Sequence, residues 1–462
     1  MSTVTRFVLS MFSAIFLMAG SVAGQHAPFT PATIDQPMLN KLTAQFEQQH
    51  KTALTISALP SKYRKDYEEV YNSRWEHIKG VFDRKEIYTA EPARKYMTDL
   101  VDVIVKGNPS LKAYPLHCYF SRTSEPNASY IGQGIILFNM GLFEKLENES
   151  QAAFVLCHEI AHYVLQHSDN AISEYISTIN SASYQQELRK VKHTEFRKRE
   201  LLEKLTKKVA FNHRRHSRNH ESQADSMAVA LMKNTAFDLS GAVTALKLLD
   251  EIDKDSIDIA ACFKKELNPA NFPFRDKWIA KSSSIIGAGV SVKAKSDMDD
   301  SLKTHPDCQT RIRLLEPFIT QNGSAKGQLF LTGKERFSAL QNTFKYEIIE
   351  YAYQAEKYSK SFYHTLILLQ QYPKDPYLVT QIGRIMNNSY TARKAHNLGK
   401  MVDLPAPEFM PGYNLVLQFF QNLYLEEFAE VSYHYLQQYS GELSSYPAFK
   451  EQLNKSALFI KQ

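Results

Sequence analysis

Cysteine and long apolar runs are both scarce in this 462-residue sequence. Its cysteines are Cys118, Cys157, Cys262 and Cys308, and no two of them form a CxxC pair. A cysteine-based zinc site is therefore not expected. Four cysteines allow three disulfide connectivities, of which Cys262–Cys308 is the first to test. After residue 24, no segment offers the roughly 20 apolar residues that a transmembrane helix needs.

Neither positive nor negative charge is in large excess. The apolar fraction of 44% and charged fraction of 23% are ordinary for a soluble globular protein, and the net charge is +6. Arg189 to Arg218 holds twelve Lys or Arg against three Glu, which could attract acidic substrate, nucleic acid or anionic lipid. Only Phe196 and Phe211 there could stack on bases. A solvated helix face is favoured, and no nucleic-acid partner is expected.

The first 24 residues differ from the rest of the chain. Arg6 is their only charged residue, Phe7 to Met18 is mostly apolar, and the small residues of Gly20 to Gly24 follow. This order is typical of a secretory signal peptide. The mature chain is expected to be periplasmic or secreted, with at most peripheral membrane contact. An uncleaved N-terminal anchor is the alternative.

Helical periodicity dominates the mature chain. Apolar residues recur at intervals of three and four over 61–107, over 150–166 with Ser150 as N-cap, and over 221–252. Strand-like patterns occur at Leu116–Phe120 and Ile131–Phe138, separated by a turn at 124–127. Residues 282–301 are typical of a loop. We expect a mainly α fold with a small β-sheet, of the α+β class.

The region 342–445 carries a period of 34 residues. Small residues and helix breakers recur at this interval, namely Ser361, Ala395 and Ala429, and Pro373, Pro407 and Gly441. The period resembles the tetratricopeptide repeat, in which stacked helix pairs bury one another. A generic helical bundle is the alternative. Either arrangement is an all-helical module suited to binding, separable from the chemistry.

The motif that carries chemistry is HEIAH at 158–162. On a helix, His158 and His162 share one face and can bind a single zinc ion. Glu159 can reach a water molecule whose pKa the metal lowers, and can accept its proton. The motif alone is only suggestive, since a solvated helix can carry two histidines by chance.

A second pair, Glu221 and Asp225, lies downstream with the same spacing. A catalytic zinc uses three protein ligands and one open position, so Glu221 can be the third ligand for one Zn²⁺ per chain. Asp225, one turn later, can accept the outer N–H of a ligand histidine and fix its tautomer. The set His158, His162 and Glu221 is the ligand layout of gluzincin metalloproteases.

With these motifs the sequence resembles a family of zinc metallopeptidases. The family includes the CAAX prenyl proteases, the heat-shock protease HtpX, the mitochondrial Oma proteases and the periplasmic protease BepA. The matching segments are NASYIGQGIILFNMGL at 127–142, AAFVLCHEIAHYVLQH at 152–167, ESQAD at 221–225 and THPDCQTRIRLL at 304–315. A signal peptide followed later by a helical repeat module resembles the BepA type.

The resemblance implies further roles. Asn127 and Ala128 begin an edge segment along which an extended substrate would pair. Arg311 would contact substrate, and His305 would stabilise the oxyanion or regulate access to zinc, with a structural capping role as its alternative. His167 also matches the motif, but five residues after His162 it leaves the ligand face and is expected to be structural.

The expected organisation is a signal peptide (1–24), a helical segment (25–84), a peptidase domain (85–318), a linker (319–340) and helical repeats (341–462). The expected function is that of an exported zinc metalloendopeptidase in envelope protein quality control or outer-membrane protein assembly. Its expected partners are misfolded or unassembled envelope polypeptides and an assembly complex held by the repeats. A chaperone-like scaffold with weak or regulated proteolysis is the alternative.

The signal-peptide interpretation generates one prediction. The mature protein is expected to begin near Gln25, because the small residues before it suit a signal peptidase. N-terminal sequencing of protein purified from its native host checks this. An intact Met1 in that protein would contradict the interpretation.

Overall fold

The computed structural model describes residues 28–55, 61–194, 218–252, 257–281, 308–322, 327–407 and 409–461. The predicted signal peptide, the 282–301 loop, most of the basic stretch and His305 lie outside these ranges. The described chain is mainly helical with one small sheet, as expected. None of the helices in these ranges has the length and apolar character needed to cross a bilayer.

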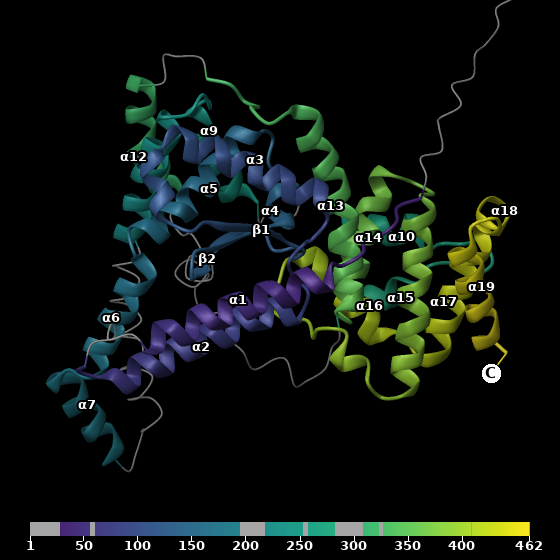
Figure 1. Cartoon of the computed structure of the whole chain (residues 1–462). Coiled ribbons are helices and arrows are strands. Elements are labelled where there is room, and N and C mark those ends of the chain that lie inside the picture. Colours follow the sequence, from purple (N-terminus) through teal and green to yellow (C-terminus); the bar gives the residue numbers. More distant parts are fainter. Residues whose placement is uncertain are drawn as a thin grey trace, which may run out of the picture.

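Two blocks of structure meet at α13 (Lys334–Gln354), which stands between them (Figure 1). The first block, called the peptidase block below, contains the sheet and the helices around it. The second, called the helical block, contains the C-terminal helices. Residues of α13 belong to the apolar cores of both blocks, so this helix joins them.

Within the described residues the sheet has three strands, in the order β1 (His117–Ser121), β3 (Ile135–Asn139), β2 (Ala128–Gly132). β1 is parallel to β3 and β2 is antiparallel to it, which leaves β2 at one edge. The single predicted strand Ile131–Phe138 is wrong, because the chain turns within it. Gly132, Gln133 and Gly134 have φ values of 109°, 53° and 75°, and this left-handed backbone makes the hairpin turn.

Alternate residues of β3 supply two apolar cores. Ile136 and Phe138 belong to the core shared with α3 (Glu91–Gly107) and α5 (Glu149–Val164). Ile135 and Leu137 face the opposite side and pack with the helical hairpin of α1 (Gln36–Thr55) and α2 (Arg64–Asp83). The sheet is covered on both faces, which explains the unbroken apolar run in β3.

The helix α5 is the centre of the peptidase block, and its residues 149–161 are all buried. Its N-cap is Asn148, whose side chain accepts a hydrogen bond from the Gln151 N–H at 3.0 Å, so the predicted Ser150 cap is wrong. Ser150 instead donates to the Asp238 carbonyl, just before α9 (Ser240–Glu251). A Cβ on Gly241 would collide with Ser150, so glycine is needed where α9 meets α5.

The described residues of the helical block form helices joined by short turns and loops, without a strand. Its longer members are α14 (Tyr358–Gln371), α15 (Pro376–Lys394), α16 (Pro411–Asn422), α17 (Leu425–Gln438) and α19 (Pro447–Phe459). Ser361 and Ala429 are buried inside α14 and α17, whereas Ala395 is the C-cap of α15. The three positions are therefore not equivalent, and the likeness to tetratricopeptide repeats stays a prediction.

The packing crosses the predicted domain boundaries in two places. The helix α10 (Ile259–Glu266) and Trp278 belong to the apolar core of the helical block, although they precede Arg311 in sequence. Phe263 of α10, for example, lies 4.8 Å from Phe419 of α16 between ring centroids. In addition, α13 spans residues on both sides of position 341. The chain thus passes from the peptidase block to the helical block and back.

None of the four cysteines forms a disulfide in this structure. The candidate Cys262–Cys308 disulfide is therefore wrong for this structure. Cys262 lies in the core of the helical block and Cys308 in the core of the peptidase block, so different partners surround them. Both act as small buried apolar side chains.

The shared packing generates a stability prediction. Trp278→Ala removes a fully buried side chain from the helical block and should lower the free energy of unfolding by about 3–5 kcal/mol. Urea denaturation monitored by circular dichroism measures the change. Leu404→Ala, at a side chain that is 69% exposed, is the control. Equal stability of the two variants would show that residues 257–281 are not held by the helical block.

Candidate metal centre

Three ligand side chains predicted from the sequence meet at one point. His158 and His162 lie one turn apart on α5, and Glu221 comes from the helix over residues 218–233. The two Nε2 atoms are 3.0 Å apart. Oε2 of Glu221 lies 3.4 Å from Nε2 of His158, and Oε1 of Glu221 lies 3.4 Å from Nε2 of His162. His158 and Glu221 are only 3% and 5% exposed. Such a group can hold a metal ion.

The separations fit zinc. Bonds of about 2.0–2.1 Å in a tetrahedral site place neighbouring ligand atoms roughly 3.3 Å apart. The observed 3.0 and 3.4 Å distances bracket this value. Two imidazoles and one carboxylate are also a donor set that zinc prefers, and they leave a fourth position for water or substrate.

Asp225 lies behind His158. Its Oδ1 is 3.0 Å from the outer Nδ1 of His158, and it accepts two hydrogen bonds from Arg311 at 2.6 and 2.7 Å. Burial raises the pKa of Asp225, but the hydrogen bonds from Arg311 and His158 outweigh burial and lower it to about 2. The charged carboxylate keeps the hydrogen of His158 on Nδ1 and turns Nε2 toward the metal position.

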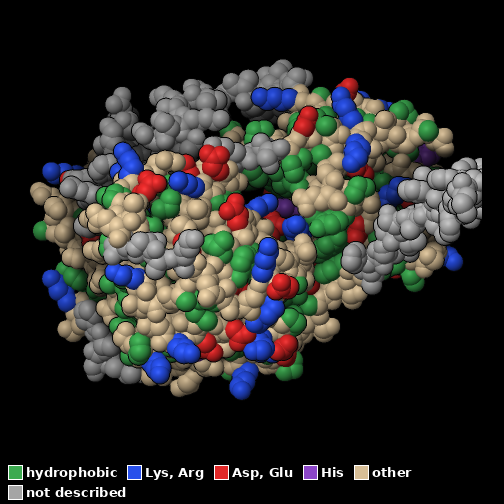
Figure 2. Space-filling model, turned by 90° about the horizontal axis from the view of Figure 1, so that it is seen from above, with side chains coloured by type: hydrophobic (Ala, Val, Ile, Leu, Met, Phe, Trp, Pro, Cys, Tyr) green, Lys and Arg blue, Asp and Glu red, His purple; other side chains and the backbone are tan. Residues whose placement is uncertain are grey.

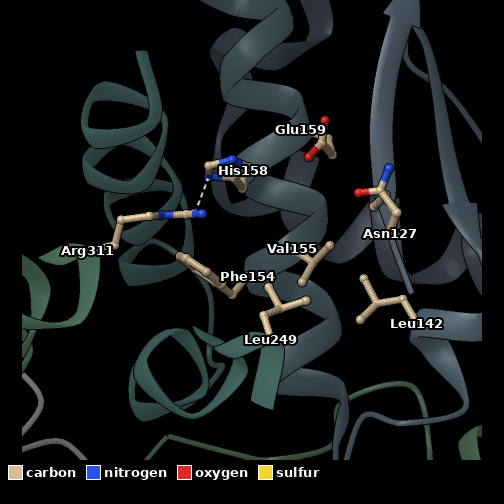
Figure 3. Close-up of a pocket in the computed structure, with 9 residues that line it drawn as sticks. Asn127, Leu142, Phe154, Val155, His158, Glu159, Leu249 and Arg311 are labelled. Atoms are coloured by element: carbon tan, nitrogen blue, oxygen red, sulfur yellow. Dashed lines mark hydrogen bonds between the residues drawn. The ribbon is translucent and has the colours of Figure 1, made fainter. Parts of the chain in front are cut away.

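Arg311 is 4% exposed and reaches the site from α12 (Cys308–Asn322). Its guanidinium is hydrogen-bonded to Asp225 and lies 3.2 Å from Glu221. It also lies 3.4 Å from Nδ1 of His158 (Figure 3). One cation therefore balances two buried carboxylates beside the ligands. This placement gives Arg311 a positioning role, while its substrate contact stays a prediction.

Sequence reasoning missed the partner of His162. The outer Nδ1 of His162 is 3.0 Å from Nδ1 of His167, and Nε2 of His167 is 3.0 Å from the Gln223 amide oxygen. An amide oxygen only accepts, so Nε2 of His167 carries hydrogen and its Nδ1 accepts from His162. Burial lowers the pKa of His167 to about 4, which keeps this ring neutral at pH 7. These two hydrogen bonds, called the His162 relay below, keep the hydrogen of His162 on Nδ1, so its Nε2 can bind the metal.

A local break in the helix explains the error. The prediction that His167 leaves the ligand face assumed that α5 continues. Gln166 has a φ of 56°, which ends α5 and starts α6 (His167–Ile179) in a new direction. His167 is thereby turned back toward His162 and is 4% exposed. A left-handed glutamine carries no clear sequence signal.

The predicted base and the predicted edge strand are neighbours. Glu159 is 3% exposed, and its Oε2 accepts a hydrogen bond from the Tyr130 N–H of β2 at 2.8 Å. Asn127 and Ala128 line a pocket of about 20 Å³ with Glu159 and His158 (Figure 3). This volume holds about one water molecule. His305 lies outside the described residues, so its role stays a prediction.

Residues 97–318 match the family model described as Peptidase family M48. The matched region contains the three ligands, Glu159, Asp225 and Arg311. This part of the chain is therefore similar to metallopeptidases, whose substrates are polypeptides. Together with the ligand cluster, the match supports Zn²⁺ as the cofactor. A comparison with curated proteins gave no match.

The His162 relay generates a prediction. His167→Ala should weaken zinc affinity roughly 10- to 100-fold, because His162 loses the partner that fixes its tautomer. Competition with a chromophoric chelator measures the affinity, and circular dichroism checks the fold. His77→Ala, at an exposed histidine of α2, is the control. Wild-type affinity in folded His167→Ala protein would show that the relay is not needed.

Proposed function

We propose that the chain is an exported zinc-dependent metalloendopeptidase. The observation that carries the proposal is the position of Glu159 between the ligand cluster and the edge strand. It follows His158 on α5, and its carboxylate accepts a hydrogen bond from the backbone of β2 at 2.8 Å. A general base is needed at this place if an extended peptide lies along β2 over the metal.

Zinc, when bound by His158, His162 and Glu221, supplies a Lewis acid that acidifies water and polarises a carbonyl group. Glu159 accepts a proton from the attacking water and passes it to the amide nitrogen of the leaving product. Asp225 and Arg311 keep His158 oriented, and His167 does the same for His162. The fixed rings avoid reorganisation of the site during the reaction.

The register of β2 supports the proposed substrate path. The Asn127 carbonyl accepts from the Asn139 N–H at 3.0 Å and so faces β3, while the Asn127 N–H donates to the Glu125 carbonyl at 2.8 Å. Along a strand, the backbone N–H and C=O groups of successive residues point alternately to one edge and to the other. The backbone groups of Ala128 and Tyr130 therefore point away from β3. The hydrogen bond from Tyr130 to Glu159 has this direction. An extended substrate would pair along the same edge.

The setting of the activity is proposed from the sequence. A signal peptide at residues 1–24 would place the enzyme in the periplasm. Its polypeptide substrates there would be misfolded or unassembled envelope proteins, as in protein quality control. The helical block would hold these chains or an envelope assembly complex, as stacked helices do in other proteins.

The base assignment generates the decisive test. Glu159→Gln should keep about one zinc per chain but lower cleavage of an unfolded protein about 10²- to 10⁴-fold, because only the proton acceptor is lost. Metal analysis and a casein cleavage assay measure the two properties. Glu335→Gln, at an exposed position of α13, is the matched control. Undiminished cleavage by zinc-loaded Glu159→Gln protein would overturn the proposal.

A further inference from the structure

A large cavity lies where the peptidase block meets the helical block. Its volume is about 410 Å³, and its walls come from the loop before β2, from the C-terminal ends of α4 (Met140–Phe143) and α9, and from α13 and α14. From above, the surface is hollowed between the two blocks, with apolar and charged side chains around the hollow (Figure 2). Neither the ligand cluster nor Glu159 lines this cavity.

The cavity and the small pocket at Glu159 are lined by neighbouring stretches of the chain. In three places, one residue lines the small pocket and a residue beside it in the chain, or one helical turn away, lines the cavity. The pairs are Asn127 and Pro126, Leu142 and Gly141, and Leu249 and Ile252. A polypeptide that leaves the metal centre along these walls therefore enters the cavity.

The direction of β2 indicates which end of a bound substrate would lie in the cavity. β2 runs from Ala128 to Gly132, and the cavity residue Pro126 lies before its N-terminal end. Antiparallel pairing is the commoner and the more stable arrangement of two strands. A substrate antiparallel to β2 runs toward Asn127 after its scissile bond. Its residues C-terminal to the cleavage point then reach the cavity.

The walls of the cavity are partly apolar and partly polar. The apolar lining residues come from both blocks and include Ile252, Ile348, Tyr363, Ile367, Leu368 and Met410. The polar ones include Lys345, His364 and Gln371. The volume of about 410 Å³ lies within the range of about 300–1,000 Å³ for ligand pockets. Among the charged lining residues, Glu144 and Lys145 pair with each other at 3.2 Å.

An ion pair near the cavity joins the helical block to the peptidase block. Lys360 of α14 lies 2.7 Å from Glu125, which is in the loop that precedes β2. Burial raises the pKa of Glu125, but Lys360 outweighs burial and lowers it, so the pair is charged at neutral pH. The contact places α14 beside the loop before β2.

We propose that this cavity is a substrate subsite for large apolar side chains on the C-terminal side of the scissile bond. The inference rests on the proposed peptidase function and adds its specificity. α14 supplies one wall, so the helical block takes part in the choice of cleavage sites. Segments with Leu, Ile or Phe after the cleavage point are the preferred substrates.

The test compares two peptides that differ only in the residues two to four places after the cleaved bond, with Leu in one and Ser in the other. Binding to the Glu159→Gln protein is measured by fluorescence anisotropy, and cleavage by the wild type is measured in parallel. The Leu peptide should bind and be cleaved better by roughly 10-fold or more. Ile367→Trp should abolish this ratio by filling the cavity, and so should Gln371→Trp at its exposed rim. Leu404→Trp, outside the lining, should keep it.

The two readouts separate the subsite from the peptidase function. Equal binding of the two peptides would overturn the subsite, even if the wild type cleaves both. A preference that survives in both folded tryptophan variants would also overturn it. Preference in binding without any cleavage by zinc-loaded wild type would uphold the cavity as a peptide site and overturn the peptidase proposal. Melting temperature and zinc content establish that each variant is folded.

Discussion

The metal centre depends on one buried ion pair, Arg311 with Asp225. The two residues are 86 positions apart, and they join α12 to the helix over 218–233 directly behind His158 of α5. Two buried carboxylates, Asp225 and Glu221, are tolerable there because a single guanidinium lies within 3.2 Å of both. Loss of the cation would leave the buried Asp225 carboxylate without its main partner and remove a positive charge beside Glu221. The pair therefore fixes the ligands and the helices that carry them.

A second constraint is that the two blocks share their cores. Phe337 and Phe344 of α13 belong to the core of the peptidase block, and Ile349 of the same helix belongs to that of the helical block. Arg122, which follows β1, forms a 2.9 Å ion pair with Glu347 of α13, and both side chains are 1% exposed. The buried pair and the shared apolar packing fix α13 on the peptidase block, and α13 in turn forms a wall of the cavity.

The features that the sequence could predict are those set by a single helix. The spacing of His158 to His162, and of Glu221 to Asp225, places each pair on one helical face regardless of the rest of the fold. The sequence did not predict features that depend on the backbone angle of one residue, such as the turn at Gln133 and the end of α5 at Gln166. Contacts between residues far apart in the sequence were not predicted either. No local pattern indicates that Arg311 pairs with Asp225 or that α10 packs in the helical block.

The edge strand β2 and the cavity between the two blocks would together select unfolded chains by two independent properties. Pairing with β2 requires a substrate whose backbone is extended and has no hydrogen-bond partner along one side, which folded proteins rarely expose. Filling the cavity requires large apolar side chains, which folded proteins mostly bury. A native protein fails both conditions, whereas a misfolded or unassembled one meets both. The hydrogen bond of 2.8 Å from the Tyr130 N–H to the Glu159 carboxylate places β2 directly beside the proposed base. Discrimination between folded and unfolded substrates then needs no further domain.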